Sequence, residues 1–205
     1  MRTVFLFALS MVGVASHANL IVNGGFESGM WEPNGDKTTV VAPGSTHITG
    51  WSVVNSTLAW IENGNPFNGY MASEGNRFLD LTGYINSAPY SGVYQMVETT
   101  PGMTYLLTFD QGVHPAYTSN INCIKAVAAG TEQIFTAVRE DMPKWVKQSF
   151  VFKADSALTK VELLGFLATP SDIGLDKVSM VAVPEPVSMA VLGAGLVGLI
   201  RRRAR

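Results

Sequence analysis

The sequence predicts an all-β fold, a β-sandwich of two antiparallel sheets. Short apolar or alternating runs recur about every 8 to 15 residues, and clusters of Gly, Asn, Pro, Ser and Thr separate them. Between the two ends of the chain, no segment keeps the 3.6-residue period of a capped helix. The chain has 205 residues, which leaves room for one domain of ordinary size.

Twelve runs have the length and composition of strands, and turn residues such as Asn23-Gly24-Gly25 and Pro101-Gly102 stand between them. The predicted strands are Asn19–Val22, Thr38–Val41, Trp51–Val54, Leu58–Ile61, Arg77–Leu81, Gly92–Glu98, Thr104–Asp110, Asn122–Ala128, Gln133–Ala137, Lys147–Lys153, Lys160–Phe166 and Ile173–Val181.

Two of these runs show which strand face turns inward. In the first, Tyr105, Leu107 and Phe109 alternate with more polar residues. In the second, Phe150 and Phe152 do the same. Because successive strand side chains point to opposite faces, each run has one face suited to a core. We therefore expect Phe150 and Phe152 in the core.

The amino-terminal end has the layout of a secretory signal peptide. Arg2 forms a short positive region, residues 4–14 are apolar, and Ser16-His17-Ala18 is a small-residue triplet of the cleavage type. The apolar run is too short to span a bilayer. The sequence therefore predicts a signal peptide at 1–18, removed after Ala18.

The other end, residues 183–205, is predicted to be a sorting tail. It contains Pro184-Glu185-Pro186, an apolar stretch at 187–200 and an arginine cluster with Arg201, Arg202 and Arg203. A helix over 187–200 would be about 21 Å long, against about 30 Å of hydrocarbon, so it is a marginal transmembrane segment. The arginines should stay cytoplasmic, which places the domain outside.

These features of the tail resemble the PEP-CTERM sorting signal of Gram-negative bacteria. The resemblance implies that an exosortase-type protease recognises the tail after transient insertion in the inner membrane. It also implies that the protein then passes to the cell envelope, the cell surface or the extracellular space.

Charge and cysteine content restrict the class of protein. Residues 19–183 hold 9 Lys and Arg against 15 Asp and Glu, a formal net charge of −6. An acidic domain without a basic run argues against nucleic acid as a partner. Cys123 is the only cysteine, so no intramolecular disulfide can form. We expect it to be buried and inert.

Several stretches of residues 19–182 carry a second resemblance. They are Asn19-Leu20-Ile21-Val22-Asn23-Gly24-Gly25-Phe26-Glu27, Ile48-Thr49-Gly50-Trp51, Phe78-Leu79-Asp80-Leu81-Thr82-Gly83, Gly92-Val93-Tyr94-Gln95 and Gly174-Leu175-Asp176-Lys177-Val178-Ser179. Together they resemble the choice-of-anchor C family, a relative of the domain-of-unknown-function 642 proteins and of several carbohydrate-binding modules. The resemblance implies a galactose-binding-like jelly roll, with Trp51 and Trp145 as core anchors.

The same resemblance implies a structural calcium site. Its first and last strands would lie side by side, so that Glu27 and Asp176 supply carboxylate oxygens and backbone carbonyls complete the shell. Lys177 departs from the family pattern, which has a second polar residue at this place, and that weakens a metal role for this position. Alternatively, Glu27 accepts turn hydrogen bonds and Asp176 is a solvated strand residue.

Carbohydrate recognition uses flat aromatic rings beside amides and carboxylates. Six aromatic residues lie in or near stretches rich in Asn, Gly and Ser, and they are the candidates for a sugar site: Trp31, Trp60, Tyr70, Tyr84, Tyr90 and Tyr117. Each of them could instead serve packing alone.

No motif indicates catalysis. His47 and His114 lie in unrelated segments without metal-ligand spacing, and no G-x-S-x-G elbow is present. We expect no enzyme activity and no organic cofactor. Three functions stay open: a surface module that binds polysaccharide, a structural component of a biofilm or extracellular matrix without a ligand, and a glycan hydrolase.

Overall fold

The computed structural model describes residues 18–66, 71–84, 88–113, 121–138, 144–169 and 172–183. These residues contain eleven strands and no helix, which confirms the predicted all-β class. The strands are β1 (Thr38–Val41), β2 (Ser52–Val54), β3 (Leu58–Glu62), β4 (Arg77–Asp80), β5 (Gly92–Glu98), β6 (Thr104–Val113), β7 (Ile121–Ala128), β8 (Thr131–Val138), β9 (Lys144–Lys153), β10 (Leu158–Thr169) and β11 (Ile173–Val183).

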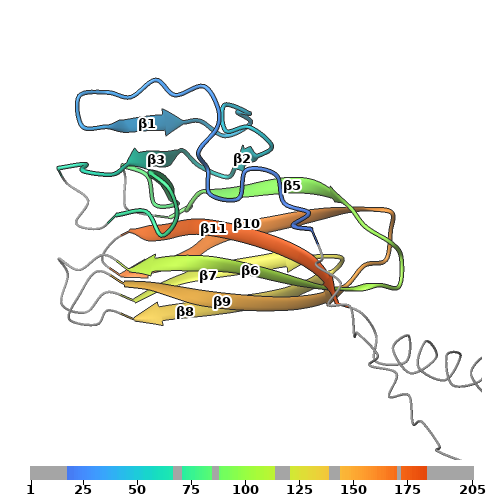
Figure 1. The fold of residues 1–205 in the computed structure, drawn as a ribbon. Helices are drawn as coiled ribbons and strands as arrows, with labels where there is room; N and C mark the ends of the chain where they lie inside the picture. The colour runs from blue at the N-terminus through green and yellow to red at the C-terminus, as the bar shows by residue number, and fades with distance from the viewer. Residues whose placement is uncertain are drawn as a thin grey trace, which may run out of the picture.

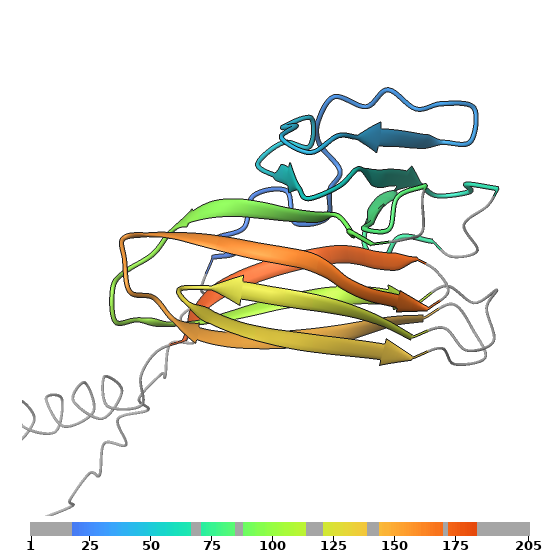
Figure 2. The same ribbon diagram turned by 180° about the vertical axis from the view of Figure 1, so that it is seen from behind.

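The strands form two antiparallel sheets packed as a jelly-roll sandwich. The six-stranded sheet has the order β1-β3-β4-β11-β6-β9, and the five-stranded sheet has the order β2-β5-β10-β7-β8. In Figures 1 and 2, β1 lies at one end of the sandwich, and β8 and β9 lie together at the other. Most neighbouring strands are distant in sequence, so each sheet brings together separate parts of the chain.

Eleven of the twelve predicted strands are present, but the strand predicted at Asn19–Val22 is wrong. This segment lies beside β11, where the Leu20 N–H donates to the Met180 carbonyl at 2.8 Å. Val22 bonds to a side chain instead, because its N–H donates to Gln95 Oε1 at 2.8 Å and its carbonyl accepts from Gln95 Nε2 at 3.0 Å. The Gln95 side chain therefore takes the hydrogen bonds that a neighbouring strand would otherwise make with Val22.

The core lies between the inner faces of the two sheets. Leu107 and Phe109 of β6 are fully buried, and Phe150 and Phe152 of β9 are almost so, which confirms the predicted alternation. Phe109 also contacts Phe135 of β8 edge to face, with ring centroids 5.3 Å apart. This contact joins the six-stranded sheet to the five-stranded sheet.

The two expected tryptophan anchors differ in depth. Trp51 is buried in the core, and its indole N–H donates to the Asn23 carbonyl at 2.9 Å. Trp145 is only partly buried and packs against Phe78 in a separate small cluster. The anchor role is therefore confirmed for Trp51, whereas Trp145 packs outside the main core. Cys123 is buried, as expected.

The predicted signal peptide and sorting tail fall almost entirely on residues 1–17 and 184–205, which lie outside the described residues. Within the part of the chain that the structure describes, no helix is long and apolar enough to cross a bilayer.

A buried carboxyl pair ties β4 to the start of β11. Asp80 is 4% exposed, and its Oδ1 accepts hydrogen bonds from the N–H groups of Thr82 and Ile173, both at 3.0 Å. The Asp172 side chain is hydrogen-bonded to Asp80. Burial, reinforced by the charge of Asp172, raises the pKa of Asp80 to about 8. Burial also raises the pKa of Asp172. The pair therefore holds a proton that ordinary carboxylates release in mild acid.

We predict that stability falls as the pH rises from about 5 to about 9. Because the folded protein holds this proton above the usual carboxyl pKa, the stabilisation is complete in acid and lost as the pH passes the raised pKa of Asp80. Asp80→Asn should keep the bonds to Oδ1 and flatten this pH dependence. Urea unfolding across this range measures it, with the exposed Asp155→Asn as control. The same pH slope in Asp80→Asn and wild type would contradict the shared proton.

Candidate functional site

The first described segment of the chain, which begins at Ala18, is held against the last strand. The Val178 N–H donates to the Gly24 carbonyl at 2.9 Å. A Cβ on Gly24 would lie 1.9 Å from the Val178 carbonyl oxygen, so only glycine fits here. Opposite this contact, the register of β11 against β6 shifts between Asp176 and Ser179, and Lys177 adopts a φ of 51°. The first described segment and the last strand therefore meet at a bulge.

Glu27 and Asp176, the predicted metal ligands, lie at this junction. Asp176 is fully buried and accepts hydrogen bonds from the Glu74 N–H at 2.9 Å and the Lys177 N–H at 2.7 Å. Burial, with a smaller contribution from the nearby charge of Glu27, raises the pKa of Asp176 to about 7. Glu27 Oε1 accepts from the N–H groups of Asn76 and Arg77, both at 2.7 Å. Glu27 thus lies close enough to influence Asp176, which is not a solvated strand residue.

This donor set fits a calcium ion in its chemistry. Calcium takes six to eight oxygen ligands. A cation would also stabilise the negative charge of a buried carboxylate that lies beside a second one. The described residues contain no group of three or more His, Cys, Asp and Glu that could hold a metal. Backbone carbonyls or water would therefore have to complete the shell. The Lys177 side chain is directed to Glu74, with 3.7 Å between Nζ and Oε2.

Two of the predicted sugar-binding aromatics serve packing. Trp60 is fully buried, and its indole N–H donates to the Phe26 carbonyl at 2.9 Å, so the prediction for Trp60 is wrong. Trp31 is partly buried and contacts Trp60 edge to face, with 4.9 Å between centroids. The Arg77 guanidinium carbon lies 4.4 Å from the centroid of Trp31. Trp31 therefore packs against Trp60 and Arg77.

The tyrosine candidates are attached to different parts of the fold. Tyr84 is 52% exposed, and its hydroxyl donates to Asp36 Oδ2 at 2.7 Å and accepts from Asn34 Nδ2 at 2.8 Å. Tyr90 is partly buried, and its hydroxyl donates to the Ala168 carbonyl at 3.2 Å. Two further candidates lie outside the described residues: Tyr70 and Tyr117. Among the described residues, no hydrogen bond or ring contact joins Tyr84 to Tyr90, so the structure gives no common binding face for them.

A different aromatic residue stands on the solvent side of the five-stranded sheet, which we call the outer face. Tyr94 of β5 lies directly opposite Glu162 of β10. The Lys160 ammonium is 4.3 Å from the centroid of the Tyr94 ring and 2.6 Å from Glu162 Oε1. An aromatic ring, a cation and a carboxylate thus meet at one point of the surface.

The same combination recurs further along the outer face. Phe166 stands at a bulge of β10 between Gly165 and Leu167, and it is 49% exposed. The Lys125 ammonium lies 5.8 Å from the centroid of Phe166 and 3.5 Å from Glu132 Oε2. Flat apolar rings beside hydrogen-bonding charges are what sugar recognition requires.

Sequence reasoning missed Tyr94, although a signal was present. Val93, Gln95 and Val97 are buried, so Tyr94 and the 48% exposed Met96 point outward by the two-residue period of a strand. The six aromatic candidates were chosen because they lie in or near loop-like stretches, whereas Tyr94 lies in the middle of β5. The strand pattern would have placed it on the surface.

Solved structures that resemble this chain include enzymes and carbohydrate-binding modules. A Stig cyclase from Fischerella sp. TAU, in complex with (3Z)-3-(1-methyl-2-pyrrolidinylidene)-3H-indole, is 15% identical over 82% of this chain and 99% of its own, with a TM-score of 0.54. The module TmCBM61, in complex with β-1,4-galactotriose, is 16% identical over 81% of this chain and 99% of its own, with a TM-score of 0.46. A xylan-binding domain from CBM 22 is 15% identical over 73% and 97%, with a TM-score of 0.44.

At these identities, structural similarity shows the fold alone. Of the three structures, only the cyclase has a TM-score above 0.5, so the similarity in fold rests on it. The family assignment comes from the sequence, because the family model described as "Protein of unknown function (DUF642)" matches residues 19–167. The match covers most of the chain and nearly all of the sandwich, from the segment that meets β11 to the end of β10. The chain belongs to the DUF642 family.

Proposed function

We propose that this protein is exported and that its sandwich binds carbohydrate on the outer face of the five-stranded sheet. The observation that carries the proposal is the arrangement around Tyr94, where an aromatic ring, Lys160 and Glu162 lie together on an open surface. A pyranose ring can stack its apolar side on Tyr94 while its hydroxyls bond to the two charged groups.

The shape of the outer face favours an extended ligand. Four neighbouring strands, β5, β10, β7 and β8, form it, and at about 4.8 Å per strand they cover about 15 Å. Met96, Ile134 and Phe166 add apolar surface, since each of them is nearly half exposed. An open surface of this extent suits a polysaccharide chain better than a small enclosed ligand.

The two competing functions have less support. A matrix component without a ligand would use the exposed apolar residues of the outer face to associate with other copies. A glycan hydrolase needs two carboxylates at a cleft, about 5 to 10 Å apart. Asp80 is 4% exposed with hydrogen bonds to its carboxylate, and Asp172 beside it is partly buried, so this pair does not stand at an open cleft. Binding without catalysis is therefore the function we propose.

Export and sorting form part of the same proposal. The signal-type segment at 1–18 and the tail at 183–205 would take the domain across the inner membrane and to an exosortase-type protease. The acidic charge of the domain and its lack of a disulfide are compatible with an extracellular domain whose stability comes from its core. A polysaccharide of the envelope or the matrix would be its partner there.

We also propose that calcium binds where the segment around Gly24 meets β11. Asp176 and Glu27 would hold it with carboxylate oxygens, and the ion would neutralise two neighbouring acids. Its role would be structural, because it would join the segment that begins at Asn19 to β11.

We predict that Tyr94→Ala weakens glycan binding about thirtyfold, or roughly 2 kcal/mol, because it removes the stacking surface. A glycan array with the purified protein identifies the ligand class, and calorimetry gives the dissociation constants. Tyr84→Ala, which removes an exposed tyrosine elsewhere, should bind as wild type. Saturable binding that Tyr84→Ala abolishes and Tyr94→Ala leaves intact would reject the outer face. Absence of any glycan binding, with oligomers that grow with concentration, would favour the matrix component.

Calcium should raise the midpoint of thermal unfolding relative to excess chelator. A ligand at about 100 times its Kd stabilises by about 2.7 kcal/mol, which amounts to several degrees in a domain of this size. Asp176→Asn should abolish the difference, and the exposed Asp155→Asn should keep it. Identical midpoints of the wild-type protein in calcium and in chelator would count against the site.

Replacement of Pro184, Glu185 and Pro186 by alanines should leave the protein in the inner membrane, because the protease would no longer recognise the tail. Cell fractionation and surface labelling measure this. Alanines at the exposed Glu32 and Pro33 form a matched control, since they remove a Glu-Pro pair within the domain. Normal surface display of the tail variant would contradict the sorting hypothesis.

A further inference from the structure

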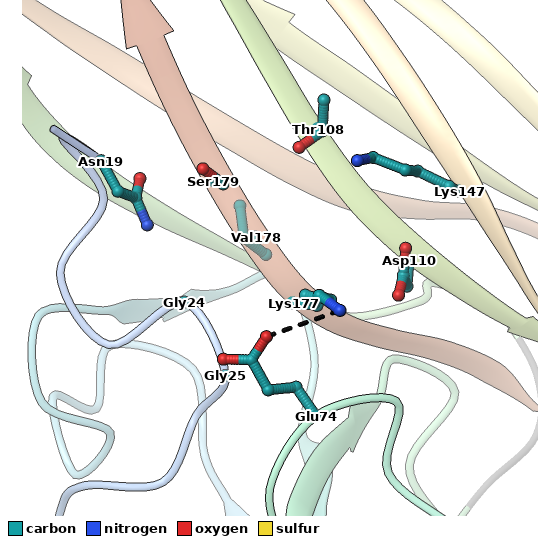
Figure 3. Close-up of a pocket in the computed structure, with 10 residues that line it drawn as sticks. All are labelled: Asn19, Gly24, Gly25, Glu74, Thr108, Asp110, Lys147, Lys177, Val178 and Ser179. Carbon is teal, nitrogen blue, oxygen red and sulfur yellow. Dashed lines mark ion pairs between the residues drawn. The ribbon is translucent and has the colours of Figure 1, made fainter. Parts of the chain in front are cut away.

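A polar cavity of about 340 Å³ lies on the opposite side of the sandwich from the outer face. Its floor is the solvent side of the six-stranded sheet, where Thr108 and Asp110 of β6 alternate with the buried Leu107 and Phe109. The segment around Gly24 forms another wall. Figure 3 shows side chains from β6, β9 and β11 around this space.

Charges of both signs line the cavity. Glu74 and Lys177 form an ion pair at 3.7 Å on one side of it. Asp110 is 9% exposed and accepts a hydrogen bond from the Ser73 hydroxyl through Oδ2. Lys147 stands opposite Asp110 in the pairing of β6 with β9, and within the described ranges its ammonium has no hydrogen bond or ion pair. The cavity therefore presents a cation that can still accept an anionic partner.

Neutral hydrogen-bonding groups complete the lining. The hydroxyls of Thr108 and Ser179 lie on neighbouring strands, because these residues are partners in the pairing of β6 with β11. Asn19 Oδ1 accepts from the N–H groups of Ile21 at 3.0 Å and Met180 at 2.9 Å, which leaves its amide nitrogen to donate. A ligand in this cavity would meet donors and acceptors on several sides.

We propose that this cavity binds one carboxylated sugar unit, a uronate. The carboxylate would bond to Lys147, ring hydroxyls would donate to Asp110, and the hydroxyls of Thr108 and Ser179 would meet the remaining ring oxygens. The volume lies at the small end of ligand pockets, which span about 300 to 1,000 Å³, so a single ring fits better than a chain.

The lining distinguishes this ligand from two others. A sulfate would place only negative oxygens against Asp110, whereas a uronate offers that carboxylate a hydroxyl donor. A small amino acid could pair with Lys147 and Asp110 but would leave the hydroxyls of Thr108 and Ser179 unmatched. The site is separate from the outer face, so the inference goes beyond the proposed function and does not depend on it.

An NMR titration of the purified protein with D-glucuronate and D-galacturonate tests the proposal, with D-glucose and D-galactose as neutral counterparts. At least one uronate should bind saturably, and its neutral counterpart should bind about tenfold more weakly or worse, because it lacks the carboxylate. Lys147→Met, which keeps the length of the side chain, should weaken uronate binding by a similar factor. The exposed Lys153→Met, on the same strand, is the matched control and should bind as wild type.

Tyr94→Ala separates this site from the outer face. It should leave uronate binding unchanged even where it abolishes polysaccharide binding, so failure of one proposal is distinguishable from failure of the other. A second variant, Thr108→Val, should also weaken uronate binding and guards against misfolding of Lys147→Met. The proposal is overturned if neither uronate saturates, if Lys147→Met and Lys153→Met bind alike, or if glycine or glutamate binds more tightly than both uronates.

Discussion

The pairing of the first described segment with the last strand is the contact on which the rest of the structure depends. β4 pairs with β11 only at Gly174 and Leu175, so the remaining length of that edge is free for another partner. The segment that begins at Asn19 takes this place through its hydrogen bonds to Met180 and Val178. Without it, the core under β11 would be open and the buried carboxylate of Asp176 would meet water.

The same pairing explains why function is expected on two separate surfaces. The segment covers part of the solvent side of the six-stranded sheet, and what remains uncovered there is a small cavity beside Lys147. Among the residues that the structure describes, no comparable segment crosses the outer face around Tyr94, so this part of the sheet stays broad and open. Under our two proposals, a single uronate and an extended polysaccharide would bind differently shaped surfaces of one domain, both made by the residues that alternate with the core.

The sequence allowed most strands and the core to be predicted, because alternation is a local property. Phe150 and Phe152 could be assigned to the core from their own strand alone. The site could not be predicted in the same way, because it depends on contacts between distant residues. Trp60 has the same local surroundings as an exposed aromatic, yet it is buried below Trp31. Asp172 meets Asp80 only because β4 and β11 are neighbours. The Gln95 side chain bonds to the backbone of Val22 in place of a neighbouring strand, and no sequence pattern predicts this contact.

Binding of carbohydrate to the outer face is tested most directly by locating the bound glycan on the protein. An NMR titration with the oligosaccharide that the array identifies, followed at assigned backbone amides, would report which strands respond. Perturbations should concentrate at Tyr94, Lys160 and Glu162 and extend along β10 toward Phe166. Perturbations confined to the loops around Tyr84 and Tyr90, with β5 and β10 unchanged, would contradict the outer face as the binding site.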